Sequence, residues 1–245
     1  MEEHPEMYTL SAEYYDLLYA GKDYAGESAR LMEIITARLG NRPLRLLDVA
    51  CGTGRHLAYL RSHFSVEGLD LSPALLAAAE RRLPGVPLHA GDMTAFDLGR
   101  RFDVVTCLFS AIGHVSSLEA LFDAVGCMAR AVQPGGLVVV EPWFTPDEWH
   151  PDTAHAQLIE QGDVKIARLN TSRVSGRVSW TDLHHLVATP QGTRHFIERL
   201  EMMLFTREEM EEAFLRAGMP VEYDEKGLTG RGLYIGTVET PSAGK

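Results

Sequence analysis

The sequence predicts an α/β protein with a mostly parallel, seven-stranded sheet and an antiparallel β insertion. Apolar runs that are typical of buried strands alternate with helical patterns from residue 27 to residue 143. This order favours right-handed crossovers between parallel strands. From residue 164 to residue 205 the apolar spacing changes to period two, which indicates antiparallel hairpins. A last helix and two strands then complete the large sheet.

The first half of the chain supplies five of the seven strands. Apolar residues at helical spacing predict a helix over 27–39. Ser72 is the expected N-cap of a helix that begins at Pro73, and Ser116 with Glu119 forms a capping-box pattern ahead of a later helix. The expected strands are 44–50, 65–70, 87–92, 101–110 and 135–143, and the other expected helices are 56–64 and 118–132.

The second half begins with a segment, 144–157, that is rich in Pro, Asp and His and is expected to form a loop. Thr206 and Glu209 form the capping box of a helix that ends at Gly218. The expected insertion strands are 164–174, 177–189 and 193–205, and the two closing strands are 219–225 and 232–239.

Composition excludes several classes of protein. The 245 residues carry a net charge of -11, which argues against a sequence-independent nucleic-acid binder because such proteins need basic surface. The three cysteines form no CxxC pattern and are expected to be small buried residues without disulfides. The N-terminus lacks the apolar core of a signal peptide, and no apolar run reaches the length of a membrane span. We therefore expect a cytoplasmic protein that is not bound to a membrane.

A polar residue stands at the carboxyl end of each of the first five expected strands. Because parallel strands end at the same edge of a sheet, these side chains are expected to converge on one ligand site. They are Asp48, Asp70, Asp92, Ser110 and Glu141.

The turn after the first strand has the sequence DVACGTG over residues 48–54. Gly52 and Gly54 let backbone N–H groups approach a ligand closely and permit angles that a Cβ would forbid. A dinucleotide fingerprint would have a third glycine where Leu57 stands, so a pyrophosphate cradle is disfavoured.

Two later acids are placed to bind an adenosine group. Asp70 ends the second strand, 22 residues after Asp48, where a carboxylate can bind both ribose hydroxyls. Asp92 offers an acceptor for the adenine amino group, and Met93 offers an apolar surface for the ring.

At residues 44–142 the chain resembles the class I S-adenosylmethionine-dependent methyltransferases, which have a Rossmann-like fold. Several segments resemble one branch more closely, the sugar N,N-dimethyltransferases that act on dTDP-linked amino-deoxysugars. These segments are GKDYA, LLDVACGTG, LHAGDM, LFSAIGH, VVVEPWF and GRGL. Segments 145–158 and 164–180 depart from the pattern of that branch and leave the identity of the sugar open.

The resemblance implies S-adenosylmethionine as cofactor and a nucleotide sugar as methyl acceptor. The residues expected to bind the cofactor are Tyr14, Asp48, Ala50, Gly52, Gly54, Asp70, Leu71, Asp92, Met93 and Phe109. Those expected to bind the acceptor are Tyr24, His114, Glu141, Trp143, Arg173 and Arg231.

The resemblance also implies a division of the chain into functional parts. Residues 1–43 are expected to form an N-terminal helical lid, 44–143 the cofactor-binding core, and 144–205 an insertion over the active site. Residues 206–239 return to the core as its last helix and strands, and 240–245 are a tail. The oligomeric state stays open, with a homodimer among the alternatives.

Methyl transfer to an amine requires an unprotonated nitrogen in line with the methyl group, and it needs no metal. His114 follows the fourth strand and is the candidate catalytic residue. It acts as a general base, positions the acceptor, or has only a structural role; positioning is slightly favoured over the base.

Other candidates also have two interpretations. Arg231, between two glycines, binds the diphosphate or is a surface arginine, and Arg173 is a weaker candidate for the same role. Trp143, with Phe144 beside it, stacks on thymine or packs in the core, and Glu141 binds substrate or only caps a strand end. Tyr14 and the adjacent Tyr15 cover the cofactor or form one face of an amphipathic helix.

Three other functions compete with the amino-sugar methyltransferase. A methyltransferase of the same fold could act at oxygen or carbon of another small acceptor. The missing third glycine counts against a nicotinamide-dependent oxidoreductase. A non-catalytic ligand-binding or scaffold protein is disfavoured by the presence of Asp48, Gly52, Gly54, Asp70 and Asp92.

Overall fold

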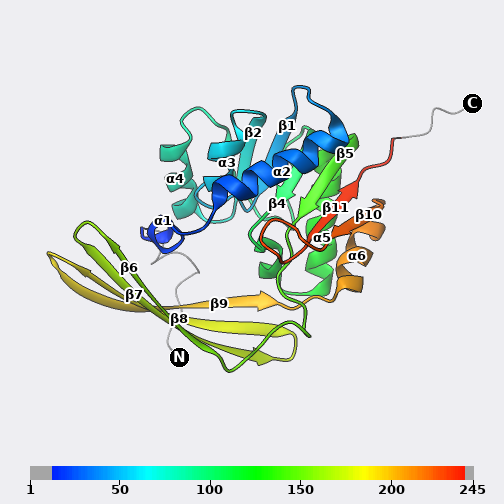
Figure 1. The fold of residues 1–245 in the computed structure, drawn as a ribbon. Helices are drawn as coiled ribbons and strands as arrows, with labels where there is room; N and C mark the ends of the chain where they lie inside the picture. The colour runs from blue at the N-terminus through cyan, green and yellow to red at the C-terminus, as the bar shows by residue number, and fades with distance from the viewer. Residues whose placement is uncertain (1–12, 241–245) are drawn as a thin grey trace, which may run out of the picture.

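The computed structural model describes residues 13–240 and contains one large sheet and one small sheet (Figure 1). The large sheet has seven strands in the order β10-β11-β5-β4-β1-β2-β3. Its strands are β1 (Arg45–Val49), β2 (Ser65–Asp70), β3 (Leu88–Ala90), β4 (Phe102–Cys107), β5 (Val132–Val140), β10 (Val221–Asp224) and β11 (Leu233–Thr237). Strand β11 runs antiparallel to both of its neighbours, β5 and β10, and all other neighbouring strands of this sheet are parallel. The predicted fold class is confirmed.

Helices cover both faces of the large sheet, and the central strands β1 and β4 are therefore buried on both sides. One core cluster joins β1 and β5 to α2 (Tyr24–Leu39) and α3 (Arg55–Leu60). The other core cluster packs α5 (Leu118–Ala131) and α6 (Arg207–Arg216) on the opposite face. The remaining helices are α1 (Tyr15–Leu18), α4 (Pro73–Arg82) and the 3-10 helix η1 (Ala111–His114).

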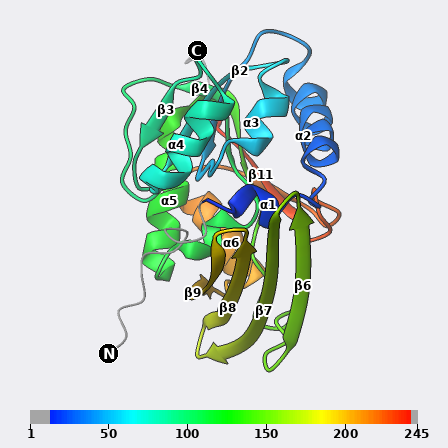
Figure 2. The same cartoon turned by 90° about the vertical axis from the view of Figure 1, so that its left-hand side faces the viewer.

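The small sheet is an antiparallel meander in the order β6-β7-β8-β9 (Figure 2). Its strands are β6 (Ala154–Gln161), β7 (Val164–Ser175), β8 (Val178–Thr189) and β9 (Gly192–Met203). Alternate residues of β8 are buried, in agreement with the period-two pattern of the sequence. Helix α1 lies against this sheet, where Leu18 packs with Ile166, Val187 and Phe196.

Several local predictions are confirmed. Ser72 accepts a hydrogen bond from the backbone of Leu75 at 3.4 Å, with Pro73 at the start of α4. Thr206 and Glu209 form both bonds of the predicted capping box. The cysteines Cys51, Cys107 and Cys127 are free and buried. Across residues 13–240, we find no helix with the length and apolar character that crossing a membrane requires.

Other local predictions are wrong by a few residues. Segment 144–157 is not loop throughout, because β6 begins at Ala154; this edge strand is exposed along almost its whole length and so lacks an apolar alternation. Ser117 rather than Ser116 caps α5, accepting a hydrogen bond from the backbone of Ala120 at 3.1 Å. The predicted pairing of Ser116 with Glu119 as a capping box is therefore incorrect.

Several predicted strands are longer than those in the structure, and two of them, β3 and β4, were expected to end at candidate site residues. β3 ends at Ala90, two residues before Asp92. β4 ends at Cys107, and the chain then leaves the extended conformation because Phe109 and Ser110 adopt positive φ angles of 53° and 61°. This left-handed pair turns the chain sharply at the edge of the sheet.

Candidate active site

The glycine turn between β1 and α3 forms one side of a pocket at the carboxyl edge of the large sheet. Gly52 has a φ of 56°, and a Cβ placed there would meet no atom within 4 Å. A Cβ on Gly54, at φ 73°, would instead lie 2.5 Å from a methyl carbon of Leu83. Gly52 therefore leaves open space for a ligand, whereas Gly54 permits close packing against the end of α4.

Asp70 fixes the conformation of this turn. Its Oδ2 accepts a hydrogen bond from the N–H of Gly52 at 2.7 Å, and its Oδ1 accepts one from the N–H of Ser72 at 2.8 Å. Burial raises the pKa of Asp70, against the opposing effect of these backbone donors. Each carboxylate oxygen can accept a second hydrogen bond, so the side chain retains the capacity to bind a diol.

The pocket beside the turn is lined by a carboxylate, that of Asp48. Its lining residues are Tyr15, Tyr24, Asp48, Ala50, Cys51, Gly52, Thr53, Arg55, His56, Leu108 and Phe109. Asp48 is fully buried and accepts a hydrogen bond from Thr106 Oγ1 at 2.7 Å. Burial raises the pKa of Asp48 to about 6. A ligand ammonium group near this carboxylate would stabilise its charged form.

Of the tyrosines near the N-terminus, Tyr15 and Tyr24 line the pocket, and Tyr14 packs against the small sheet. Tyr15, not Tyr14, lines the pocket, since Tyr14 packs with Leu18 and Phe196 against the small sheet. Tyr24, expected on the acceptor side, lies in the same pocket as Asp48 and Gly52.

A buried ionic cluster next to the pocket was not predicted from the sequence. Glu27 is 5% exposed; its two oxygens contact the Lys22 ammonium and, at 2.8 Å, His56 Nε2. Burial alone would raise the pKa of Glu27, but the bonds to His56 and Lys22 lower it. The Lys22 ammonium also lies 4.3 Å from the centre of the Phe109 ring. The cluster joins α2, α3 and the end of β4.

Residues expected to contact adenine follow β2 and β3. Leu71 directly follows Asp70 and is 70% exposed, so it offers apolar surface beside the candidate ribose site. Asp92 is exposed, and both of its hydrogen bonds, from the backbone and hydroxyl of Thr94, end on Oδ1. Met93 is partly buried against the core.

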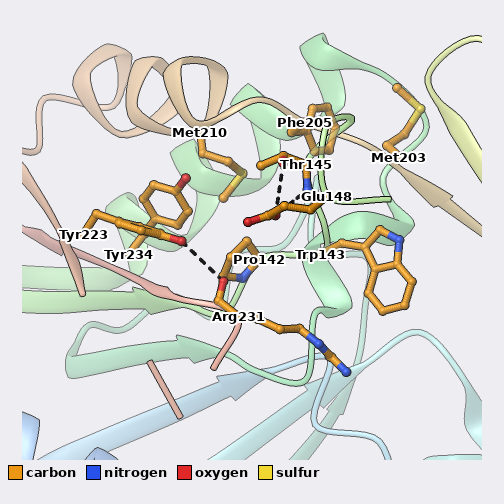
Figure 3. A pocket seen from close by; sticks show the side chains of 10 residues that line it. All are labelled: Pro142, Trp143, Thr145, Glu148, Met203, Phe205, Met210, Tyr223, Arg231 and Tyr234. Atoms are coloured by element: carbon orange, nitrogen blue, oxygen red, sulfur yellow. Dashed lines mark hydrogen bonds between the residues drawn. The ribbon is translucent and has the colours of Figure 1, made fainter. Parts of the chain in front are cut away.

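A second pocket lies beside the end of β5 (Figure 3). Its lining residues are Pro142, Trp143, Thr145, Glu148, Met203, Phe205, Met210, Tyr223, Arg231 and Tyr234. The Arg231 guanidinium carbon lies 5.3 Å from the Trp143 ring centre and 5.4 Å from that of Phe144. One guanidinium nitrogen donates a hydrogen bond to Ser110 Oγ at 2.9 Å. The structure therefore places a cation and two aromatic rings together, a combination that can bind a phosphate group and a planar ring.

Glu141 connects the two pockets. It is fully buried; Oε2 accepts a hydrogen bond from the N–H of Phe109 at 2.6 Å, and Oε1 accepts one from Thr229 Oγ1 at 2.5 Å. Both carboxylate oxygens of Glu141 are hydrogen-bonded within the protein. This geometry fits the alternative in which Glu141 caps the end of a strand and does not bind substrate. It holds the left-handed turn at Phe109 and Ser110 against the loop that carries Arg231.

His114 is the last residue of η1, and η1 packs against β9 of the small sheet. A Cβ on the adjacent Gly113 would lie 2.8 Å from Met202 Cε and 3.0 Å from Trp143 Cβ, so the packing here is tight. Burial lowers the pKa of His114 to about 4, although a backbone contact with Glu201 acts in the opposite direction. The imidazole is therefore neutral at pH 7.

The small sheet is attached to the second pocket through Trp143. The indole N–H donates to Ser179 Oγ at 3.0 Å, and that hydroxyl donates to the carbonyl of Met202, also at 3.0 Å. Arg173, a further candidate for acceptor binding, is exposed on β7 and lines neither pocket.

Comparison with known proteins agrees with this geometry. A family model described as "Methyltransferase domain" matches residues 46–136. The fold and the glycine-turn pocket thus define a methyltransferase with a Rossmann-like core.

Three proteins that are similar over almost the whole chain define the family more closely. The dTDP-3-amino-3,6-dideoxy-alpha-D-glucopyranose N,N-dimethyltransferase of Streptomyces fradiae is 45% identical, over 92% of this chain and 89% of its own. The crystal structure of Streptomyces venezuelae DesVI is 40% identical with a TM-score of 0.88, over 92% of this chain and 97% of its own. CalS10 of Micromonospora echinaspora, an amino pentose methyltransferase whose structure contains bound S-adenosylmethionine, is 41% identical with a TM-score of 0.84, over 92% and 96%. The chain belongs to the family of these sugar N-methyltransferases, which confirms the resemblance.

Proposed function

We propose that the protein transfers methyl groups from S-adenosylmethionine to the amine of a dTDP-linked amino-deoxysugar and produces the N,N-dimethylamine. The observation that carries the proposal is the pair of pockets at one sheet edge, joined by Glu141. One pocket has the glycine turn and carboxylates that suit an adenosyl amino acid. The other has the cation and aromatic rings that suit a nucleoside diphosphate.

The residues around the glycine turn fit the cofactor. The space beside Gly52 admits backbone contact, and Asp70 has acceptor capacity for the ribose hydroxyls. Leu71, Asp92 and Met93 would contact adenine. The remaining proposed contacts are Asp48, Ala50 and Phe109, with Tyr15 in the place expected for Tyr14.

The acceptor would lie between the second pocket and His114. Arg231 would bind the diphosphate, and Trp143 would lie against the nucleobase. We propose that the insertion, residues 144–205, limits the space for the sugar, because its β9 and Ser179 hold His114 and Trp143 in place.

The chemistry needs little from the protein beyond orientation. Bound S-adenosylmethionine supplies an electrophilic methyl group, and the amine lone pair forms the new N–C bond as the S–C bond breaks. The protein must hold nitrogen, carbon and sulfur in line, which can supply up to about 7–11 kcal/mol of the acceleration. His114 is neutral at pH 7 and can hydrogen-bond the acceptor, while the amine proton passes to water.

Binding and turnover test the proposal in sequence. Thermal shift should show stabilisation by S-adenosylmethionine, S-adenosylhomocysteine and dTDP but not by NAD; about 2.7 kcal/mol is expected at a hundredfold excess over Kd. Mass spectrometry of reactions with dTDP-3-amino and dTDP-4-amino sugars should show gains of one and then two methyl groups. Absence of methylation on every dTDP-amino sugar, with turnover of a hydroxylated or carbon acceptor, would establish the competing O- or C-methyltransferase instead.

A further inference from the structure

Arg55 lines the cofactor pocket but has no part in the function described so far. It is the first residue of α3 and follows Gly54 directly. Among the described residues that line this pocket, it is the one arginine or lysine. We propose that Arg55 binds the α-carboxylate of the cofactor's methionyl group. This inference rests on the proposed function, because it names the part of S-adenosylmethionine that enters this pocket.

Tyr24 holds the guanidinium in place from one side. The Arg55 guanidinium carbon lies 4.7 Å from the centre of the buried Tyr24 ring. Stacking on a ring occupies the face of a guanidinium and leaves its N–H edge available for hydrogen bonds. The side chain is 24% exposed, so it remains within reach of a ligand.

Arg55 has spare donors. Both of its contacts with Asp16 use the same nitrogen, Nη1, at 3.3 Å from the backbone oxygen and 3.6 Å from Oδ1. A guanidinium has five N–H donors and binds carboxylates through two parallel bonds. Within the described chain, Nη2 and Nε have no such bond, and they form the edge that a carboxylate needs.

Asp16 does not depend on Arg55 for a partner. Arg82 contacts Asp16 Oδ2, and Thr53 Oγ1 donates to Oδ1 at 2.9 Å. The Arg55 guanidinium can therefore turn from Asp16 to a ligand without leaving a carboxylate unpaired.

Two other charged groups near the pocket are Lys22 and Asp48. Lys22 is committed to Glu27 and to the Phe109 ring, so it offers no free cation to the pocket. Asp48 is a buried acid on the pocket floor and would face the ammonium group. One cation and one anion in the same pocket match the two charges of an α-amino acid.

Binding of two ligands by calorimetry tests the role of Arg55. The ligands are S-adenosylmethionine and decarboxylated S-adenosylmethionine, which lacks only the carboxylate. Wild-type protein should bind the intact cofactor at least tenfold more tightly. Arg55→Gln should weaken binding of the intact cofactor about 10- to 100-fold, as expected for loss of a charge-assisted bond. It should change binding of the decarboxylated ligand less than threefold.

Two more variants serve as controls. Arg55→Lys retains the charge and should keep part of the preference for the carboxylate. Arg61→Gln changes an exposed arginine at the end of the same helix and should leave both affinities unchanged. Circular dichroism checks that every variant is folded, and the wild-type preference needs no variant at all.

The outcomes separate the two proposals. Equal weakening of both ligands by Arg55→Gln, or no wild-type preference for the carboxylate, overturns the role of Arg55 while leaving the proposed function intact. Failure of wild-type protein to bind S-adenosylmethionine overturns both.

Discussion

Replacement of His114 by asparagine tests how the enzyme handles the proton of its amine substrate. His114 ends η1 next to the β9 strand, and burial lowers the pKa of its imidazole to about 4. Asparagine preserves a hydrogen-bonding group of similar size at the same place but cannot act as a base. The variant therefore separates proton transfer from positioning.

The pKa sets the size of the expected effect. The pKa of His114 is about 4, so pH 7 lies about three units above it. Protonating this imidazole at pH 7 therefore costs roughly 4 kcal/mol. Such a base is poorly matched to neutral pH, and loss of it should cost little. Loss of one neutral hydrogen bond to the acceptor costs about 0.5–1.5 kcal/mol. We expect kcat/KM to fall about 2- to 13-fold, partly through KM, with an unchanged pH–rate profile.

Steady-state kinetics across pH 5–9 with a dTDP-amino sugar, measured separately for the first and second methylation, supply the assay. A loss of kcat above about a thousandfold with KM unchanged, or a flattened acidic limb, would show that His114 is the base. Such a result would refute the positioning role.

The same variant gives a second measurement that does not involve substrate. Between about pH 6.5 and pH 4 the unfolded chain protonates His114 and the folded chain does not. The unfolded state thus binds more protons, and the free energy of unfolding falls as the pH drops through this range. His114→Asn should reduce this fall, as measured by urea unfolding at pH 7 and pH 4.5. An identical fall in both proteins would contradict the lowered pKa.

Three further substitutions test the two pockets. Asp70→Ala should weaken S-adenosylmethionine binding more than tenfold by calorimetry and lower Tm, because it removes the acceptor of the Gly52 N–H as well as the ribose ligand; unchanged affinity would exclude Asp70 from the site. Gly52→Val should abolish cofactor binding with little change in circular dichroism, since its side chain would fill open space at a positive φ; a folded variant that binds normally would disprove the cradle. Arg231→Ala should raise KM for a dTDP-amino sugar far more than for the free amino sugar, with unchanged cofactor affinity; equal effects on both sugars would make Arg231 structural.

The sequence predicted the large sheet because its strands carry strong local signals. Buried strands such as 65–70 are bounded by polar or small residues, and the Thr206–Glu209 capping box is encoded within four positions. The sequence did not predict β6, because this exposed edge strand has no buried apolar face. It is held by backbone pairing with β7. The choice between Ser116 and Ser117 as cap depends on backbone angles that residue type does not set.

The candidate site was predictable to the extent that topology alone brings residues together. Asp48 and Asp70 converge because β1 and β2 are parallel neighbours. The Lys22–Glu27–His56 cluster was not predictable, since Glu27 and His56 lie 29 positions apart and meet only when α2 packs on α3. The bonds of Glu141 span 32 and 88 positions and leave no local pattern.

The strand order of the large sheet has a consequence for synthesis on the ribosome. β5 is complete at Val140, but its outer neighbour β11 begins only at Leu233. While the intervening residues emerge, the meander β6–β9 can form from adjacent hairpins, yet β5 presents an open edge to other nascent chains. Thr229, the late partner of Glu141, arrives immediately before β11 closes that edge. The segment from Thr229 to the end of β11 therefore both covers the edge of the sheet and contributes Arg231 to the second pocket, so a product truncated before this segment would be prone to aggregate.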